Sequence, residues 1–365
     1  MTAVQLRLMT FPARFRMRFT HGSATRSETE NVVCIAHAGG LTGYGEGCPR
    51  GYVTGETIAT ATRFFEAHRA SLADISDLPT LRAWIGAHGD AIDANPAAFA
   101  AIEIALIDLF AQQAGQGVEA FLGLPPPRAV IISAALGVTG RMATAAISFG
   151  YRAFGMTNAK VKLSPDPAAD RARLTIIRRT IGRAARLRVD ANNLFQSADD
   201  CTAHLKATGA QVWAIEEPLA ARDYAGMRAV ASMTGARIIL DESGVRPEDL
   251  ANVEGADWIV NLRVSKHGGL LRSLDMLQTA RQRGLGVILG CHVGETSILS
   301  RAALALAAAC GVDLIAMECA YGGYLLAHDL TEPRIRFGRG GIITAPADGP
   351  GLGVTVLRDR LVPVT

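Results

Sequence analysis

Six ionisable residues recur along the second half of the chain at nearly constant spacing. They are Lys162, Asp190, Glu216, Asp241, Lys266 and Glu318, and the intervals between them are 28, 26, 25, 25 and 52 residues. One strand-helix unit of a (β/α) barrel has about that length, so each residue would return to the rim at the carboxyl ends of the strands, where barrel active sites lie. We therefore expect six charged groups around one barrel mouth.

Three of these residues have the chemistry of metal ligands. Asp190, Glu216 and Asp241 would supply carboxylates from three successive strands, and like charges this close repel unless a cation neutralises them. Oxygen ligands without Cys or His favour Mg²⁺. For any single acid, capping of the following helix is the simpler explanation, but it does not account for three acids in register. Asn192 is expected beside these ligands.

Lysines are expected on both sides of the metal. Lys160 and Lys162 alternate along a strand, so both ammonium groups project to one side. Their mutual repulsion is expected to lower a pKa, so that Lys162 serves as general base while Lys160 stays charged and holds a substrate carboxylate. Lys266, at the sixth strand, would face the substrate from the opposite side.

The elements that must position these residues follow from the hydrophobic pattern. Helical spacing dominates from residue 57 to about residue 123, and the proline-rich stretch that ends at Pro127 cannot continue a helix. Short apolar runs then alternate with helical segments, which is typical of a parallel sheet wound with helices. Eight strands are predicted: 130–135, 157–163, 187–192, 212–218, 237–242, 258–266, 286–293 and 314–320.

The predicted fold class is α/β, a modified TIM (β/α) barrel with an N-terminal α+β capping domain. The capping domain would span residues 1–127 and the barrel, with the metal and catalytic residues, residues 128–325. Residues 326–365 are rich in glycine and proline and are expected to pack back on the capping domain. The length of 365 residues suits two such units.

Composition narrows the class of partner. The net charge of +3 is small, and Lys and Arg are scattered, which gives little support for nucleic acid and favours a small-molecule substrate. The six cysteines form no metal-binding spacing and are expected to be reduced core residues. No apolar run is expected to approach the roughly 18 residues of a membrane span, so the cytoplasm is the predicted compartment.

These residues resemble the enolase superfamily, and within it the subgroup of muconate-lactonizing enzymes and dipeptide epimerases. In that family a Lys-x-Lys ends the second barrel strand, metal-binding acids end the third to fifth, and a lysine ends the sixth. Lys160 and Lys162, the three acids and Lys266 match in order. The resemblance implies a mobile capping loop that contacts substrate, to which His21 to Arg26 and Arg50 to Thr54 are similar, and oligomerisation is common in the family.

The resemblance implies a Mg²⁺-dependent racemase or epimerase that acts through an enediolate on a dipeptide or an N-acylated amino acid. The mandelate-racemase branch uses a histidine on the seventh strand, but Lys266 occupies the sixth-strand position here, so His292 is expected to be neutral and hydrogen-bonded near the mouth. His21, Arg50 and Glu318 are the remaining candidates for substrate contact.

Two other functions stay open. Dipeptide epimerases of the family carry Asp-x-Asp after the eighth strand, whereas this chain has Glu318-Cys319-Ala320. Glu318 resembles instead the glutamate of muconate cycloisomerases, so a cycloisomerase or an acid dehydratase that uses the same enolate is the alternative. A non-catalytic barrel that only binds a ligand would be expected to have lost a lysine or an acid, and none is lost.

Overall fold

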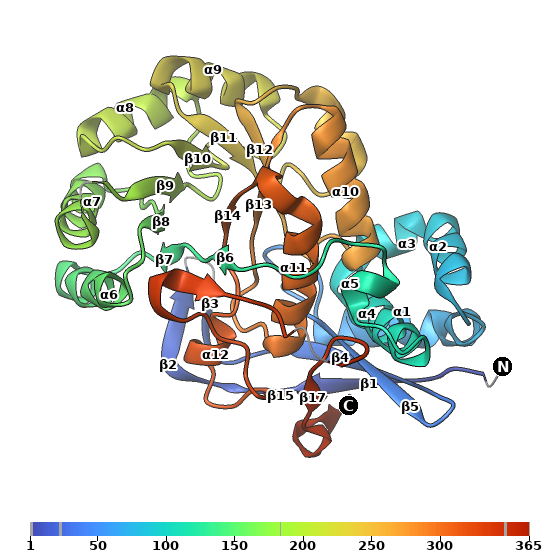
Figure 1. Ribbon diagram of the computed structural model, residues 1–365. Coiled ribbons are helices and arrows are strands. Elements are labelled where there is room, and N and C mark those ends of the chain that lie inside the picture. Colours follow the sequence, from blue (N-terminus) through green and yellow to red (C-terminus); the bar gives the residue numbers. More distant parts are fainter. Residues whose placement is uncertain (1–2, 22–23, 183, 347–348, 365) are drawn as a thin grey trace.

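A four-stranded antiparallel sheet forms the base of the N-terminal half (Figure 1). The computed structural model describes residues 3–21, 24–182, 184–346 and 349–364, without the side chains of residues 17–21 and 24–26. The sheet has the order β18-β1-β4-β5, and β2 and β3 form a separate hairpin. The strands are β1 (Gln5–Phe11), β2 (Arg14–His21), β3 (Ala24–Glu28), β4 (Asn31–Ala38), β5 (Leu41–Gly47) and β18 (Val362–Pro363).

One long helix packs directly on this sheet because alternate residues of β5 are glycine. A Cβ atom on Gly45 would lie 2.1 Å from the carbonyl oxygen of Ala101, and Gly43 and Gly47 approach the same helix at successive turns. Small residues on both surfaces let the two backbones touch. The helices of this half are α1 (Ile58–Ala73), α2 (Leu78–Ala87), α3 (Gly89–Ala94), α4 (Pro96–Gln113) and α5 (Val118–Phe121).

The sequence-based expectation of no apolar run long enough to span a membrane is wrong for α4. This helix has 18 residues and is long and apolar enough to cross a membrane. Among the described residues it is the one helix of which this is true. However, 89% of it is buried inside the protein. Its apolar composition is accounted for by packing, since it lies between β5 and the other helices.

Eight parallel strands close into the predicted barrel. They pair in the order β7, β8, β9, β10, β11, β12, β13 and β14. The ring is closed by a parallel bridge between Ile132 and Met317, with Ser133 N donating to Met317 O at 2.8 Å. The strands are β7 (Ala134–Leu136), β8 (Asn158–Lys162), β9 (Arg186–Asp190), β10 (Ala214–Glu216), β11 (Arg237–Leu240), β12 (Trp258–Leu262), β13 (Gly286–Leu289) and β14 (Leu314–Met317).

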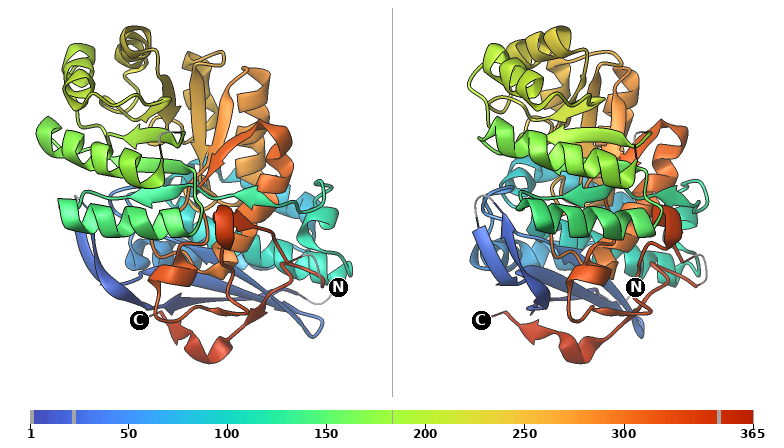
Figure 2. Two further views of the ribbon diagram at one scale, coloured as in Figure 1. Left: turned by 60° about the vertical axis from the view of Figure 1, so that its left-hand side comes forward. Right: turned by 90° about the vertical axis from the view of Figure 1, so that its left-hand side faces the viewer.

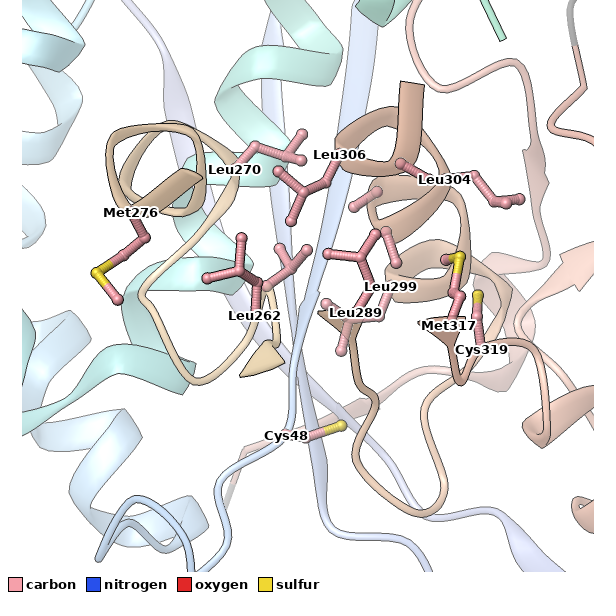
Figure 3. Close-up of a cluster of buried hydrophobic side chains, with 14 of the residues drawn as sticks. Cys48, Leu262, Leu270, Met276, Leu289, Leu299, Leu304, Leu306, Met317 and Cys319 are labelled. Atoms are coloured by element: carbon pink, nitrogen blue, oxygen red, sulfur yellow. The ribbon is translucent and has the colours of Figure 1, made fainter. Parts of the chain in front are cut away.

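Helices surround the barrel and bury the outer faces of its strands (Figures 1 and 2). Figure 3 shows Leu262, Leu289 and Met317 from three neighbouring strands meeting side chains of the two helices that follow β12 and β13. The helices are α6 (Arg141–Ala153), α7 (Pro167–Ile181), α8 (Ala198–Thr208), α9 (Tyr224–Thr234), α10 (Leu270–Gln282) and α11 (Ser297–Cys310), with short 3-10 turns η1 (Pro247–Asn252) and η2 (Gly311–Asp313).

Two barrel helices begin against carboxylates from the N-terminal half. Glu103 of α4 accepts hydrogen bonds from Leu270 N at 2.9 Å and Leu271 N at 2.6 Å, at the start of α10. Glu46 of β5 accepts from the backbone and hydroxyl groups of Thr296 and from Leu299 N, at the start of α11. These bonds satisfy N–H groups at the helix starts that have no acceptor within their own helix.

The chain after the barrel returns to both halves. A short strand at residues 342–343 pairs with one at residues 130–131, and β18 pairs with β1. The remaining elements are β6 (Val130–Ile131), α12 (Gly322–Leu325), β15 (Thr331–Glu332), η3 (Arg339–Gly341), β16 (Ile342–Ile343), β17 (Thr355–Val356) and η4 (Arg358–Arg360). The division into domains at residues 127 and 325 stays a prediction.

Candidate active site

The register of the parallel strands brings the predicted acids to one rim. Glu216, the last residue of β10, lies directly opposite Asp190, the last residue of β9, and Asp190 lies opposite Lys162 of β8. Asp241 is the first residue after β11. All three carboxylates are buried. The strands therefore gather the predicted acids and the Lys-x-Lys pair at the carboxyl end of the barrel.

Lys160 is surrounded by carboxylates. Its ammonium group lies 2.7 Å from Glu216 Oε1, 3.1 Å from Asp190 Oδ2 and 3.6 Å from Glu318 Oε2. Burial alone would lower the pKa of Lys160, but the three negative charges outweigh burial and raise it. Lys160 is therefore a permanent cation at the centre of the acids.

Lys162 has the opposite electrostatic environment. Its ammonium group donates to Asn192 Oδ1 at 2.7 Å and lies 3.9 Å from Asp190 Oδ2. The pKa of Lys162 is lowered, first by burial and also by the charge of Lys160, which exceed the opposing effect of Asp190. Repulsion between the two lysines thus contributes as expected, but burial is the larger cause. Its side chain keeps 26% of its surface exposed.

Lys266 lies in the turn after the sixth strand, not within it. The strand was expected to reach residue 266, but β12 ends at Leu262 because the chain then turns toward α10. Its ammonium group is buried and donates to Asp241 O, Asp241 Oδ1 and Asn261 O at 2.7, 2.9 and 2.9 Å. Burial, and then the charge of Arg263, lower the pKa of Lys266 to about 7.

Arg263 is a site residue that the sequence analysis missed. Its guanidinium contacts Asp241 Oδ2 and lies 3.7 Å from Glu216 Oε1, so it bridges two of the predicted metal ligands. It follows β12 directly. The prediction relied on the regular interval between Asp241 and Lys266. The first position after β12, which is Arg263, would have indicated a side chain at the rim more directly.

The acids fit a cation, although the side chains as they stand do not enclose one. Among the described residues, no group of three or more His, Cys, Asp and Glu side chains is arranged to hold a metal ion. The reason is that Lys160, Arg263 and Lys266 lie against the carboxylates. Glu216 Oε2 is buried, with no hydrogen-bond partner among the described residues. A spare buried acceptor within an all-oxygen donor set suits a hard divalent cation.

Glu217 supports the ends of β10 and β11 and was also missed. Its Oε1 accepts from Asp241 N at 2.6 Å and Ser243 N at 2.7 Å, and Asn193 donates to its Oε2 at 3.2 Å. Burial raises the pKa of Glu217 to about 7 despite these bonds. The sequence did contain a signal for Glu217. Adjacent side chains along a strand project to opposite faces, so of the neighbours Glu216 and Glu217 only one was expected to face the metal site, and the other could be assigned a structural role.

Glu318 lies just after β14 and is neutralised from two sides. Arg188, two residues before Asp190 on β9, donates to Glu318 Oε1 and also to Ser133 Oγ at 3.1 Å. Burial would raise the pKa of Glu318, but Lys160 and Arg188 outweigh burial and lower it. Arg188 was not predicted, and nothing in its local sequence distinguishes it from the neighbouring Arg186.

The hydrogen bond expected for the His292 ring is not formed among the described residues. Burial, followed by the charge of Arg263, holds the pKa of His292 well below its usual value. Neither ring nitrogen has a hydrogen-bond partner among the described residues, and Nδ1 lies 3.5 Å from Glu295 Oε1. The Glu295 oxygen is used instead by the backbone N–H of His292, at 2.6 Å.

The structure does not bring Arg50 into this cluster. The Arg50 guanidinium is buried and donates to Asn31 Oδ1 at 2.7 Å and Val293 O at 3.1 Å, so it ties β4 to the loop after β13. Its hydrogen bonds are therefore made within the protein, in contrast to the predicted substrate contact. The backbone of His21 ends β2, while its side chain lies outside the described residues.

Comparison with known proteins agrees with this architecture. Residues 141–360 match the family model described as enolase C-terminal domain-like. The hydrophobic dipeptide epimerase of Enterococcus faecalis is 31% identical over 76% of this chain and 78% of its own length, and muconate cycloisomerase 1 of Rhodococcus opacus is 27% identical over 93% of each. A crystal structure of the dipeptide epimerase from Enterococcus faecalis, complexed with Mg and L-Leu-L-Tyr, has a TM-score of 0.83 at 26% identity and covers 97% of this chain and 99% of that one.

Proposed function

We infer that this chain, which belongs to the enolase superfamily and to its muconate-lactonizing and dipeptide-epimerase subgroup, is an isomerase that moves the α-proton of a small carboxylate substrate. The observation that carries the proposal is the pair of lysines with lowered pKa values. Lys162 lies on β8 and Lys266 follows β12, four strands away in an eight-stranded ring, so the two flank the mouth from opposite sides.

We propose Asp190, Glu216 and Asp241 as the ligands of Mg²⁺. The ion would stabilise the second negative charge that develops on the substrate carboxyl group when the α-proton leaves. Lys160 adds a fixed positive charge on the same side, because its carboxylate partners keep it protonated. Asn192 orients Lys162 through the hydrogen bond to its ammonium group.

Proton transfer on two faces follows from the lysines' own chemistry. Lys266, whose pKa is lowered to about 7, is present both as acceptor and as donor at neutral pH, and the lowered pKa of Lys162 makes its neutral, proton-accepting form easier to reach. If Lys162 removes the proton and Lys266 returns one to the other face, the configuration at carbon inverts. Racemisation or epimerisation is the result.

The substrate we favour is an N-acylated amino acid rather than a dipeptide with a free amino group. The acid after the eighth strand, Glu318, already has Arg188 and Lys160 as cationic partners. A substrate ammonium group would have to compete with both for the same carboxylate, and would add positive charge to a site that already holds three lysines and two arginines. An acylated nitrogen carries no charge and avoids this cost.

The alternative function is cycloisomerisation, or dehydration, through the same enolate. The glutamate at position 318, where the dipeptide epimerases have Asp-x-Asp, favours it. In that case one lysine would transfer the proton and the other would act only through its charge. Cytoplasmic location and homo-oligomeric assembly stay predictions.

The test is deuterium exchange. The protein is incubated with Mg²⁺ in D₂O and a set of N-acylamino acids, dipeptides and muconate, while deuterium uptake and product mass are followed by mass spectrometry. We expect α-deuterium with inverted configuration, lost on chelation of the metal and in Lys162→Ala or Lys266→Ala, but kept in Lys206→Ala, which alters an exposed lysine of α8. Ring closure or loss of water without inversion would select the alternative function. No exchange and no product with any compound would contradict both.

A further inference from the structure

A cavity lies in the C-terminal segment and shares no lining residue with the barrel mouth. Its volume is about 460 Å³. Its lining residues come from β15, from the chain that follows β15, and from η4 and the residue before it. Its lining consists of Thr331, Glu332, Pro333, Arg334, Arg336, Leu357 and Arg360, which we call the arginine cavity.

The arginine cavity carries a net positive charge. Three arginines face one glutamate in its lining, and Arg16 lies close by, since it and Arg334 both approach the carbonyl oxygen of Leu326. Among the described residues none of these arginines forms an ion pair within 4.0 Å. Burial, and the charges of Arg336, Arg16 and Arg360, lower the pKa of Arg334 against the opposing effect of Asp329.

Asp329, the acid whose charge acts on Arg334, is already used elsewhere. Asp329 accepts from Ser297 N at 3.0 Å and Ser297 Oγ at 2.8 Å, at the start of α11, and it is fully buried. It therefore stabilises that helix N-terminus rather than closing an ion pair with the arginines. The guanidinium groups of the cavity are therefore free of an ion pair with Asp329 and could interact with an anionic ligand.

The guanidinium groups are held in place by neutral contacts. Arg334 donates to Ala327 O at 2.9 Å and Arg360 to Asp329 O at 2.6 Å, while the Arg336 guanidinium lies 5.5 Å from the ring centre of Tyr324. Main-chain oxygens and an aromatic face orient these cations without cancelling their charge. Each guanidinium has five N–H donors, so several stay available.

We propose that the arginine cavity binds a small polyvalent oxyanion, a phosphate ester or a polycarboxylate. Guanidinium groups bind such anions through paired, charge-assisted hydrogen bonds, and donors that are already oriented lose little freedom on binding. The volume falls within the roughly 300–1,000 Å³ of small-molecule sites. Leu357 and Pro333 add apolar surface for a carbon skeleton. The proposal does not depend on the proposed function, because binding is measured without substrate.

The experiment is isothermal titration of the full-length protein with pyrophosphate and with citrate, in Mg²⁺-free buffer at fixed ionic strength. We expect saturable binding of one anion per chain that weakens as NaCl is raised. Tighter binding of pyrophosphate would identify a phosphate-ester site, and tighter binding of citrate a polycarboxylate site.

Variants locate the binding. Arg336→Gln removes a side chain whose one described polar contact is with an aromatic ring, so the fold is kept, and we expect binding at least tenfold weaker. The double variant Arg334→Gln/Arg360→Gln should abolish binding, whereas Arg171→Gln, an exposed arginine of α7, should leave it unchanged. Absence of saturable binding by either anion would overturn the proposal. So would equal binding by wild type and Arg336→Gln, which would place the anion at another site such as the lysines of the barrel mouth.

Discussion

Substitution of Gly45 by alanine should separate α4 from β5 and destabilise the protein strongly. The new Cβ atom would lie 2.1 Å from Ala101 O and 2.5 Å from Ala105 N, whereas ordinary contacts begin at 3.4 Å. Both neighbours are backbone atoms of a buried helix, so no side-chain rotation can relieve the overlap, and the helix must move by about 1 Å or more. Overpacking costs about 1–3 kcal/mol, and a backbone clash should fall at the upper end, about 3 kcal/mol.

A glycine with free space around it provides the matched control. Gly86 lies in α2, and an added Cβ would meet no atom within 4 Å. Gly86→Ala should therefore stabilise the protein by about 0.5–1 kcal/mol, because alanine favours the helix. Thermal and urea unfolding of both variants measures the two effects, and a loss of about 3 kcal/mol corresponds to a fall of roughly 4 °C in Tm for a chain of this length. A Gly45→Ala protein within about 0.5 kcal/mol of wild type would refute the view that backbone contact fixes this packing.

Three further substitutions test the electrostatic arguments. Burial raises the pKa of the Glu103 carboxyl group from 4.5 to about 7, so the folded protein binds this proton more tightly than the unfolded chain does. The resulting contribution to stability is complete below about pH 4.5 and is lost as the pH rises through about 7. The difference in unfolding free energy between wild type and Glu103→Gln should therefore fall by up to about 3 kcal/mol over that range, and a difference independent of pH would contradict the assignment. Arg301→Met breaks a buried pair in which Arg301 donates to Glu119 at 2.6 and 2.7 Å, and should cost about 3–5 kcal/mol, most of it regained in the double variant Arg301→Met/Glu119→Leu. Arg188→Met removes one cationic partner of Glu318 and should raise kcat/KM for dipeptides relative to N-acylamino acids about tenfold, while an unchanged ratio would count against Glu318 as the determinant.

The sequence predicted the barrel well because most of its strands follow one simple rule. Six of the eight strands, all but β7 and β13, end at or directly before a charged residue, so spacing alone located Asp190 and Glu216 at the ends of β9 and β10. Strand ends were less predictable. The predicted strand 258–266 continues past Leu262, because the residues of the turn are as buried as those of the strand and a hydrophobic pattern does not separate the two.

Residues whose role depends on a partner far along the chain were not predictable from local pattern. Arg188 contacts Glu318 across 130 residues, and Arg263 reaches Asp241 across 22. Either arginine, considered alone, has the sequence appearance of a solvated surface residue. The same limit applies to Arg50, whose position in a candidate substrate loop gave no sign that its hydrogen bonds are made within the protein.

The capping of α10 by Glu103 and of α11 by Glu46 also limits how such a protein can be divided or recombined. A chain that began at residue 128 would keep every barrel strand but would lose the carboxylates that accept from Leu270 N and Leu271 N of α10 and from Thr296 N and Leu299 N at the start of α11. A barrel joined to an unrelated N-terminal half would need an acid at both places. Exchange of halves between relatives should therefore succeed only where these two carboxylates are exchanged together with the half that supplies them.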